Sequence, residues 1–398
     1  MTGILHGLRL VEMVAFVAGP MAGMTLAQTG ADVVRIDPIG GGVDNDRWPL
    51  SPNGVSLYWA GLNKGTRSVA LNLRQPEGRD IARALIVHAG AFLTNLQARG
   101  ELAYEALRQA RPDLIMTTIR GNPDGGIAVD YTVNAMTGLP YLTGPLDAAG
   151  PVNHVFPMWD MAAALSAVNA TLAAERWRRE TGQGQHVTLA LADVALAMMS
   201  HLGFLADAEI SGRNRPKMGN HVYGTFGRDF ATSDGRRLIV VVVTDRQWKA
   251  LGEATGLVEK FALLERLLDV DLRREGDRHR ARDLIAAVIE PWCAARTMQQ
   301  IAATFEAAGV LWGPYRTTTE MLAEDPRCSL ANNLLGRIDQ PGVGPHLAAG
   351  SIADFSEAPR EPPRRAPQLG EHTEEVLSER LGFSQAKIGQ LIEQGIAA

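Results

Sequence analysis

The chain has 398 residues, of which 46% are hydrophobic and 21% are charged, with a formal net charge of -5. This length favours two domains, and the composition is that of a globular protein with buried cores, which excludes disordered and fibrous classes. The negative charge without a polybasic run argues against nucleic acid and anionic membranes as partners and favours small molecules.

The N-terminal sequence lacks a basic segment followed by a long apolar run, so we expect no signal peptide. No stretch approaches the roughly 20 apolar residues of a membrane span. Cys293 and Cys328 form no Cys-x-x-Cys pair, and the histidines lack the helical spacing of a zinc site. We therefore expect reduced thiols, a cytoplasmic protein and no metal.

The first part of the chain alternates short apolar runs of strand length with longer helical patterns. This alternation is typical of parallel strands joined by crossover helices, the unit of a doubly wound α/β sheet. The expected strands are residues 8–13, 31–37, 67–73, 91–96 and 114–121, and the expected helices between them include residues 18–30 and 77–90.

Two long helical patterns run from Asp160 to about Leu205, interrupted by TGQGQH and the strand-like VTLAL. The chain then becomes polar and glycine-rich, and a hairpin-like SDG turn precedes the apolar run LIVVVV. Amphipathic helical patterns follow over residues 245–310, and a proline-rich segment at 356–377 leads into a final helix.

These changes in composition and in hydrophobic pattern predict the domain layout. We expect residues 1–205 to form the N-terminal part of a large domain and 206–223 to form a linker. We expect 224–312 to form a smaller domain, and 313–398 to form a second linker and a C-terminal return to the large domain. A tail that crosses back would explain so long a connection without secondary structure of its own.

Asp160 is the only charged residue between Val155 and Glu175, where an aromatic loop becomes an alanine-rich helix. One interpretation is a helix N-cap, because an aspartate oxygen accepts hydrogen bonds from the free N–H groups of the first turn. The other is a positioned nucleophile, walled by Phe156 and Trp159. Both interpretations can hold at once.

The loop after the first strand, AFVAGP, lacks the GxGxxG pattern, although Asp37 stands where dinucleotide enzymes place a ribose-binding acid. We therefore do not expect a redox dinucleotide. Coenzyme A is an adenine nucleotide of another kind, and Lys64, Arg67 and Arg99 could neutralise its phosphates. Each of these cations could also be an ordinary surface charge.

Ordered segments along nearly the whole chain resemble the class III CoA-transferases. These segments are VAGPMAGMTLAQTGADVVRID, NKGTRSVALNL, TNLQARG, MWDMAAALSAVNATLAAERWRRETGQGQHVTLALADVALAMM, GRDFATSDGRR and APQLGEHTEEVL. The resemblance implies an α/β fold with a Rossmann-like large domain from both chain ends, a smaller middle α+β domain and an interlocked homodimer. It also implies that Asp160 is the nucleophile and that coenzyme A enters as part of an acyl-CoA substrate, without a permanently bound cofactor.

The resemblance implies two further groups of site residues. The candidates for contacts with coenzyme A are Phe16, Val17, Ala18, Lys64, Arg67, Asn95, Arg99, Asp130 and Tyr131. The candidates for holding a substrate carboxylate are Arg47, His221 and Tyr223. A surface salt bridge is an open alternative for Arg47. A purely structural role is an open alternative for His154, His221, Trp159 and Tyr223.

Three features depart from relatives of the family. Val17 stands where many relatives have glutamine, and the connection after Asn95 is shortened, which leaves the contacts around Asn95 and Arg99 open. Val129 stands where related racemases have a histidine, so we do not expect a two-base racemase.

Within the family, segments such as GILHGLRLVE, WAGLNKG, GLPYLTGP and GNHVYGTFGRDF resemble members that move CoA between the two carboxyl groups of mesaconate, in the 3-hydroxypropionate bicycle of carbon fixation. This likeness implies an intramolecular transfer through an aspartyl-CoA thioester. Intermolecular transfer between an acyl-CoA and a free dicarboxylic acid is the alternative, and a non-catalytic acyl-CoA-binding protein is a third. Backbone N–H groups of GNHVYG or GTFG are candidates for oxyanion stabilisation.

Overall fold

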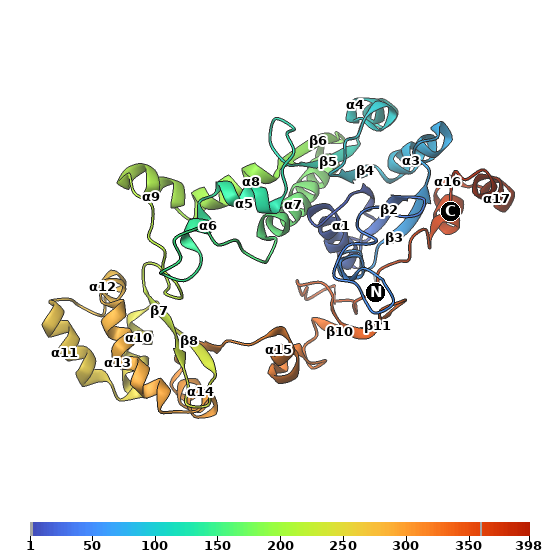
Figure 1. The fold of residues 1–398 in the computed structure, drawn as a ribbon. Coiled ribbons are helices and arrows are strands. Elements are labelled where there is room, and N and C mark those ends of the chain that lie inside the picture. The colour runs from blue at the N-terminus through green and yellow to red at the C-terminus, as the bar shows by residue number, and fades with distance from the viewer. Residues whose placement is uncertain (1–2, 359) are drawn as a thin grey trace. The chain divides into compact units, whose positions relative to one another are not determined.

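The structure is a computed structural model that describes residues 3–358 and 360–398, and the chain divides into two compact units (Figure 1). Unit 1 consists of Met1–Thr137, Val155–Ile210 and Pro326–Ala398, and unit 2 of Gly138–His154 and Ser211–Asp325. Segments from both halves of the chain therefore build unit 1.

Residues 138–154 lie in unit 2, although the sequence analysis placed them within 1–205. The ammonium group of Lys217 donates hydrogen bonds to the carbonyl oxygens of Ala148 (3.0 Å) and Gly150 (2.9 Å). These contacts join segments almost seventy positions apart, which a local sequence pattern does not reveal.

A parallel six-stranded sheet forms the centre of unit 1, in the order β3-β2-β1-β4-β5-β6. Its strands are β1 (Arg9–Met13), β2 (Asp32–Pro38), β3 (Arg67–Leu71), β4 (Ala91–Thr94), β5 (Ile115–Arg120) and β6 (Gln185–Ala190). The predicted α/β class with a doubly wound parallel sheet is confirmed, and the strand-like VTLAL lies in β6. This is the strand order of dinucleotide-binding folds, whose ligands bind at the carboxyl ends of the strands.

Helices connect and flank these strands. They are α1 (Ala18–Gln28), α2 (Leu57–Leu62), α3 (Pro76–Ala89), the 3-10 turn η1 (Gly100–Leu102), α4 (Tyr104–Ala110), α5 (Asp130–Met136), α7 (Met158–Thr181), α8 (Leu191–His201), α9 (Phe204–Ser211), η2 (Pro326–Cys328), α16 (Thr373–Leu381) and α17 (Gln385–Glu393). The helix predicted to start at Asp160 is α7, which ends at Thr181 and is followed by Gly182 in the left-handed conformation typical of a helix C-terminus.

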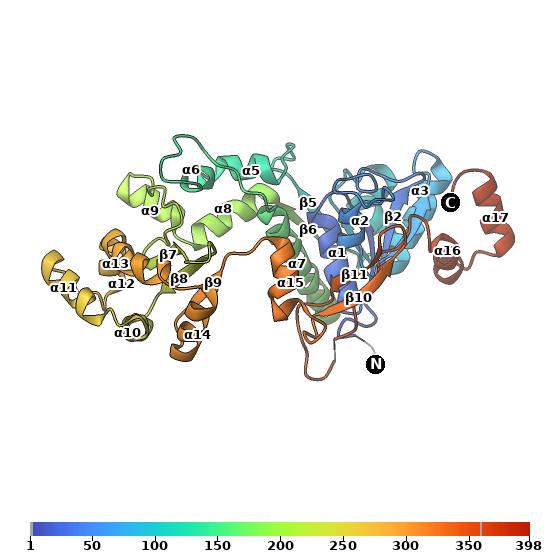
Figure 2. The same ribbon diagram turned by 60° about the horizontal axis from the view of Figure 1, so that its bottom comes forward.

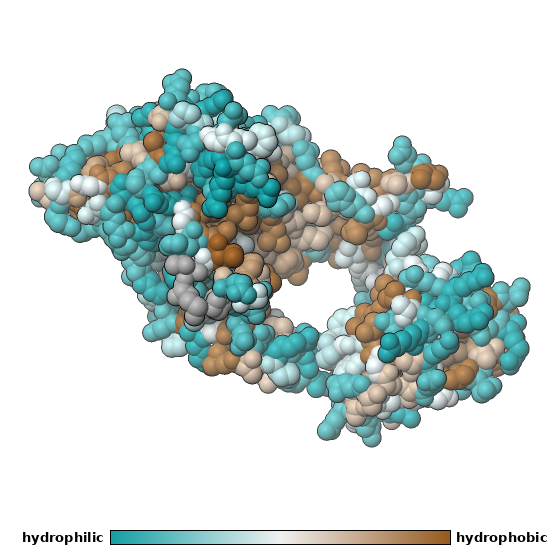
Figure 3. All heavy atoms as spheres, turned by 180° about the vertical axis from the view of Figure 1, so that it is seen from behind, coloured by the Kyte–Doolittle hydropathy of each residue, from teal (hydrophilic) through white to brown (hydrophobic). Residues whose placement is uncertain are grey.

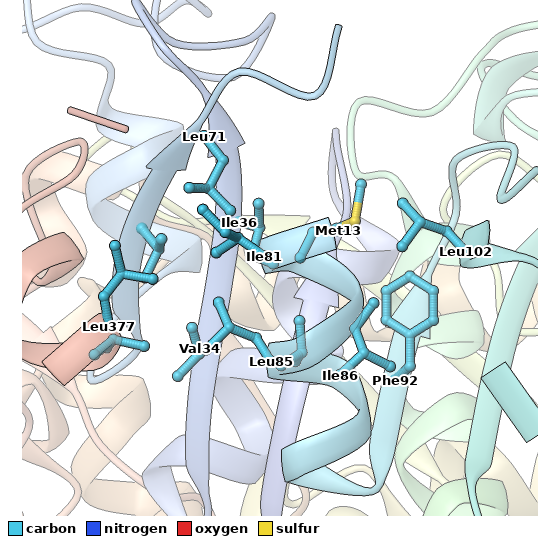
Figure 4. Packing of buried hydrophobic residues seen from close by; sticks show 14 of the residues in the cluster. Met13, Val34, Ile36, Leu71, Ile81, Leu85, Ile86, Phe92, Leu102 and Leu377 are labelled. Atoms are coloured by element: carbon cyan, nitrogen blue, oxygen red, sulfur yellow. The ribbon is translucent and has the colours of Figure 1, made fainter. Parts of the chain in front are cut away.

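Successive residues of each strand face opposite layers of helices, as the pleat requires. On β1, Val11 and Met13 belong to a core with Ile81 and Leu85 of α3 (Figure 4). Glu12 faces the other layer, because a Cβ atom at Gly23 of α1 would lie 1.7 Å from its carboxylate. Glycine at position 23 is therefore needed for α1 to lie so close to the sheet.

The end of the chain closes the outer edge of β3. Ala398 donates its N–H to the carbonyl of Ala70 (3.1 Å), and Asn72 donates to that of Ile396 (2.9 Å). Helices α16 and α17 stand beside α3 and β3 in both views (Figures 1 and 2). Leu377 of α16 completes the same core. This cover protects an edge strand that would otherwise expose unpaired backbone groups.

Unit 1 also contains a two-stranded antiparallel hairpin of β10 (Leu335–Gln340) and β11 (Gly344–Ala349). The sequence analysis expected a linker and a C-terminal return to the large domain over residues 313–398, but it did not foresee this hairpin. The side chain of Gln28 at the end of α1 donates to the carbonyl of Ala349 (3.1 Å). Tertiary contacts of this kind stabilise a hairpin whose strands carry few β-branched residues.

Unit 2 combines a small antiparallel sheet with helices. Its elements are α6 (Leu139–Leu142), β7 (Phe226–Ala231), β8 (Arg237–Val242), α10 (Asp245–Thr255), α11 (Val258–Leu268), α12 (Glu275–Arg280), α13 (Arg282–Ala294), α14 (Met298–Ala308), β9 (Trp312–Pro314) and α15 (Thr318–Glu324). The SDG turn joins β7 to β8 as predicted, with Gly235 at φ 75°. Phe226, Leu238 and Phe305 lie in the core of this unit.

Among the described residues, no single helix is long and apolar enough to cross a bilayer. Helices α8 and α9 reach the necessary length and apolar character only when they are taken together, and the chain bends by 66° between them.

Candidate active site

Asp160 is the third residue of α7, and its side chain is half-buried. The N-cap of α7 is Pro157, which supplies no side-chain hydrogen bond. The prediction that Asp160 is itself the helix cap is therefore wrong, because the helix begins two residues earlier. The interpretation of Asp160 as a nucleophile does not depend on a capping role.

The cap of α7 comes from α5. The buried carboxylate of Asp130 accepts hydrogen bonds through Oδ2 from the backbone N–H groups of Trp159 (2.7 Å) and Asp160 (3.1 Å). The indole N–H of Trp159 donates to Oδ1 of Asn134, one turn further along α5 (3.2 Å). Asp130, expected from the sequence to contact coenzyme A, thus directs one carboxylate oxygen to the start of α7.

The environment of Asp160 raises the pKa of its carboxyl group to about 6, well above the usual value for an aspartate. Burial is the largest cause, because a low-dielectric surrounding disfavours the charged form, and the negative charge of Asp130 adds to it. The positive charge of Arg47 acts in the opposite direction. At neutral pH Asp160 is mainly ionised and more basic than an exposed aspartate.

Arg47 lies on the segment between β2 and α2, where its guanidinium lies over two aromatic rings. Its Cζ atom is 4.5 Å from the ring centroid of Tyr58 and 5.5 Å from that of Phe16. Its Nη1 atom is buried and has no hydrogen-bond partner within residues 3–358 and 360–398. A guanidinium held by aromatic faces, with donor capacity left over, is suited to bind a carboxylate.

The first expected contacts with coenzyme A are Phe16 and Val17, which lie in the loop after β1, and Ala18, which begins α1. Phe16 adopts a left-handed backbone conformation with φ 67°, which is uncommon for a residue with a side chain. Asp44 accepts the N–H of Phe16 (2.8 Å), and Asn95 both accepts from and donates to the backbone of Ala15 (2.9 and 2.7 Å). The amide of Asn95 therefore ties the ends of β1 and β4 together.

A buried cluster of charged residues, which the sequence analysis missed, holds the Phe16 loop in place through hydrogen bonds. Arg35, 2% exposed, donates to the carbonyl of Val14 (3.0 Å) and to Asp44 (3.1 Å), Asp37 (3.0 Å) and Asn63 (3.0 Å). Asp37 is thus paired with Arg35 inside the protein. The sequence signal that could have revealed this cluster is the pair of charged residues, Arg35 and Asp37, at alternating positions of the otherwise apolar strand β2.

Lys64 and Arg67, expected to contact coenzyme A, lie at the amino end of β3. Arg67 is ion-paired with Asp32 (2.7 Å), Glu375 (3.0 Å) and Glu379 (3.1 Å). Lys64 is half-buried, and this burial lowers the pKa of its ammonium group. The Phe16 loop stands at the opposite, carboxyl edge of the sheet, so these placements do not support the two expected contacts.

A cavity of about 690 Å³ opens at the carboxyl ends of β4 and β5, next to Asn95. Arg120, Gly121 and Gly126 border it. His186, another lining residue, stacks on Tyr104 with ring centroids 4.8 Å apart. Arg99 is exposed just beyond β4, and Tyr131 of α5 is also partly exposed.

His221 and Tyr223 lie in unit 2. His221 is buried, its Nε2 atom is 3.3 Å from a carboxylate oxygen of Asp283, and burial lowers the pKa of its imidazole. Tyr223 packs edge-on against His279, with ring centroids 5.2 Å apart, and carries Arg215 over its ring at 4.6 Å. Their expected contact with a substrate carboxylate stays a prediction.

Within the described residues, no group of three or more potential ligands is arranged to hold a metal ion. Cys293 and Cys328 are free thiols, and burial raises the pKa of the Cys293 thiol to about 12. A thiol with so high a pKa is a poor nucleophile at neutral pH.

Fold and site together define a class of protein: the chain belongs to CoA-transferase family III, which it matches over residues 5–373. The family resemblance seen in the sequence is confirmed. A solved CaiB/BaiF family protein from Brucella suis is 28% identical, with a TM-score of 0.78 over 95% of this chain and 100% of that one.

Two curated relatives are informative about chemistry. The chain is 53% identical to the 2-methylfumaryl-CoA isomerase of Chloroflexus aurantiacus, over 100% of this chain and 98% of that protein. It is 30% identical to the succinyl-CoA:mesaconate CoA-transferase of Haloarcula marismortui, over 95% of this chain and 96% of that protein. One name describes a rearrangement within a thioester, and the other a transfer between two acids.

Proposed function

We propose that this protein is an intramolecular CoA-transferase that converts 2-methylfumaryl-CoA, mesaconyl-C1-CoA, into 3-methylfumaryl-CoA, mesaconyl-C4-CoA. The observation that carries this proposal is the half-buried Asp160 at the start of α7, between the charges of Asp130 and Arg47. The full-length likeness to the Chloroflexus isomerase supplies the substrate.

The first half of the proposed reaction moves CoA onto Asp160. A carboxylate oxygen of Asp160 attacks the C1 thioester carbonyl, the carbon–sulfur bond breaks, and a mixed anhydride forms as the CoA thiolate leaves. The thiolate then attacks the side-chain carbonyl carbon of Asp160 and expels the C1 carboxylate, which leaves an aspartyl-CoA thioester. Covalent catalysis of this kind divides one difficult transfer into easier steps.

The second half repeats these steps at the other end of mesaconate. The C4 carboxylate attacks the aspartyl-CoA carbonyl and expels the thiolate, which then attacks the C4 carbonyl of the new anhydride and releases the Asp160 carboxylate. No proton is consumed overall. Retention of mesaconate makes the return attack unimolecular, an advantage of roughly 7–11 kcal/mol in favourable cases.

Arg47 is the residue that we propose to hold the carboxylate that is not in the thioester. Its stacked guanidinium has a buried Nη1 atom available, and its charge acts on Asp160. A planar guanidinium can bind a carboxylate through two parallel hydrogen bonds. His221 and Tyr223 of unit 2 are further candidates, as are backbone N–H groups of the glycine-rich residues 219–227 for the oxyanion.

Coenzyme A, as part of the substrate, is proposed to run along the carboxyl edge of the sheet. The loop of Phe16, Val17 and Ala18 and the cavity beside Asn95 lie at this edge, where nucleotides bind in open α/β sheets. Arg99 and Arg120 are the cations at this edge that we propose for the phosphates.

We also propose an interlocked homodimer in the cytoplasm, a compartment in which free thiols such as Cys293 and Cys328 stay reduced. Exposed apolar side chains on α8, α9 and their junction support an interface, since a monomer seldom exposes many of them together. Examples are Leu196, Met198, Leu202, Leu205 and Ile210. Figure 3 shows hydrophobic side chains exposed on one face of the protein.

Isotope exchange distinguishes the proposed intramolecular transfer from intermolecular transfer. The second reaction is the one that the name of the Haloarcula relative describes. Unlabelled mesaconyl-C1-CoA is incubated with enzyme and excess carbon-13 mesaconate, and the thioesters are analysed by mass spectrometry. We expect the C4 thioester to appear without label, because the retained acid attacks first. Label entering at a rate comparable to isomerisation would establish intermolecular transfer instead.

The control in this experiment is Asp160→Ala, which we expect to form no C4 thioester while still binding CoA. In wild-type enzyme quenched during turnover, peptide mass spectrometry should find CoA attached to Asp160. Turnover of Asp160→Ala near the wild-type rate would remove Asp160 from the mechanism.

A further inference from the structure

Helix α7 begins without a cap of its own. Pro157 at the N-cap has no side-chain hydrogen bond, so the N–H groups of the first turn need acceptors from elsewhere. Asp130, thirty residues before Asp160, accepts from the second and third residues of the helix. An N-cap side chain normally accepts from these same positions.

Asp130 is buried and belongs to a helix, so its position is well defined. It is 2% exposed and is the first residue of α5, and Asn134 on the same helix binds the indole N–H of Trp159. Two side chains one turn apart on α5 thus hold the main chain and the side chain of Trp159. The backbone of Asp160, the next residue, is fixed as a consequence.

The capping contact also affects the Asp160 carboxylate. Because Asp130 occupies the N–H groups at the start of α7, they are not available to the Asp160 side chain, which receives no hydrogen bond from any residue that the structure describes. Hydrogen bonds to a carboxylate stabilise its charged form and make it less basic. The groups whose charge acts on Asp160 are Asp130 on α5 and Arg47 on the segment before α2.

We propose that Asp130 is a positioning residue for the reaction: it caps α7 in place of Asp160, fixes the first turn of the helix, and leaves the Asp160 carboxylate unbonded for attack. This inference rests on the proposed function, in which Asp160 is the nucleophile. It replaces the expectation that Asp130 contacts coenzyme A.

The test compares Asp130→Asn with Asp130→Ala in the full-length enzyme, through the pH dependence of kcat/KM. Asparagine keeps an oxygen that can accept from the backbone but removes the negative charge. Because a neighbouring like charge raises the pKa of Asp160, its removal should move the acid limb of the profile to lower pH. Asp130→Ala also removes the acceptor, and misorientation should lower kcat by about 100-fold.

If Asp130 had only a structural role, its replacement would not move the acid limb of the pH profile of kcat/KM. We expect Asp130→Asn to retain about a tenth of the wild-type kcat, with KM for the thioester nearly unchanged. The matched control is Asp193→Asn, which removes an exposed carboxylate from the first turn of α8 and should leave the profile unchanged. A rise in KM with kcat unchanged in Asp130→Asn would make Asp130 a substrate contact and overturn the proposal.

A second measurement does not need turnover. Carbon-13 NMR of aspartate-labelled enzyme, with Asp160 assigned by comparison with Asp160→Asn, should show Asp160 titrating at lower pH in Asp130→Asn than in wild type. An unmoved titration in a folded variant would overturn the positioning role. A moved titration in an enzyme inactive on mesaconyl-CoA would support that role and count against the proposed function.

Discussion

At the scale of single residues, the chemistry depends on how three charges share a small space. Burial and Asp130 raise the pKa of Asp160, and Arg47 lowers it. The resulting pKa of about 6 leaves the Asp160 carboxylate mainly ionised at neutral pH, and it makes this carboxylate more basic than it would be in water. An aspartate with a wholly satisfied hydrogen-bond shell would be ionised but less nucleophilic.

Asp160 contributes less to stability than its position near a helix start suggests. The hydrogen bonds that cap α7 go to Asp130, so an Asp160→Ala variant retains them. The same variant no longer buries a carboxylate, which is itself unfavourable.

The first prediction at this scale concerns Arg47→Gln. Loss of a hydrogen bond between charged groups costs about 1.5–3 kcal/mol, so KM for a substrate with a free carboxylate should rise roughly 10- to 100-fold. Because Arg47 lowers the pKa of Asp160, its removal should raise that pKa and move the acid limb of kcat/KM to higher pH. Steady-state kinetics from pH 5 to 8 measure both effects.

The control for Arg47 is Arg337→Gln, which removes an exposed guanidinium from β10 in the same unit. It should change neither KM nor the pH profile. An acid limb at the wild-type pH in Arg47→Gln would mean that the charge of Arg47 does not act on Asp160.

At the scale of elements, the carboxyl edge of the sheet carries the candidate site and the amino edge carries structural ion pairs. Arg67 joins β3 to Asp32 of β2 and to Glu375 and Glu379 of α16. Arg380 of α16 pairs with the same Asp32. These contacts fasten the C-terminal helices to the sheet.

This arrangement predicts that Arg67→Gln affects stability rather than substrate binding. The partly exposed ion pairs are worth about 1 kcal/mol together, so the free energy of unfolding of unit 1 should fall by that amount. KM for the CoA thioester should stay within about twofold of wild type, in contrast to Arg99→Gln at the other edge. A tenfold rise in KM for Arg67→Gln would restore its expected role in binding coenzyme A.

At the scale of the whole molecule, unit 1 is assembled from three separate segments and unit 2 from two. The chain therefore leaves unit 1 and returns to it more than once. Such repeated crossings, together with exposed apolar side chains on α8 and α9, suit the proposed dimer in which two chains pass through one another.

Interlocking has a kinetic consequence that a simple dimer lacks. Sedimentation should give twice the chain mass of 42.9 kDa at all accessible concentrations. Two preparations with different tags, mixed when folded, should form no mixed dimers, because interlocked chains separate only on unfolding. Unfolding and refolding the mixture is the control and should produce them. A stable monomer, or rapid mixing of folded dimers, would contradict the proposed interlocking.

The sequence by itself determined the succession of strands and helices along the first part of the chain, the SDG hairpin, the family and Asp160 as the candidate nucleophile. These features depend on local periodicity, turn residues and ordered motifs, which neighbouring residues encode. The C-terminal return was expected from its proline-rich approach, but the hairpin of β10 and β11 was not.

Only the tertiary structure decided which side chains act together at the site. Asp130 caps α7 across thirty residues, Arg35 reaches Val14 across twenty-one, and Lys217 holds residues 148–150. Lys64 and Arg67 looked like Arg99 in the sequence, yet lie at the amino edge of the sheet. A charged residue in a loop has no local signature of its partner, because partners are fixed by long-range packing that brings distant segments together.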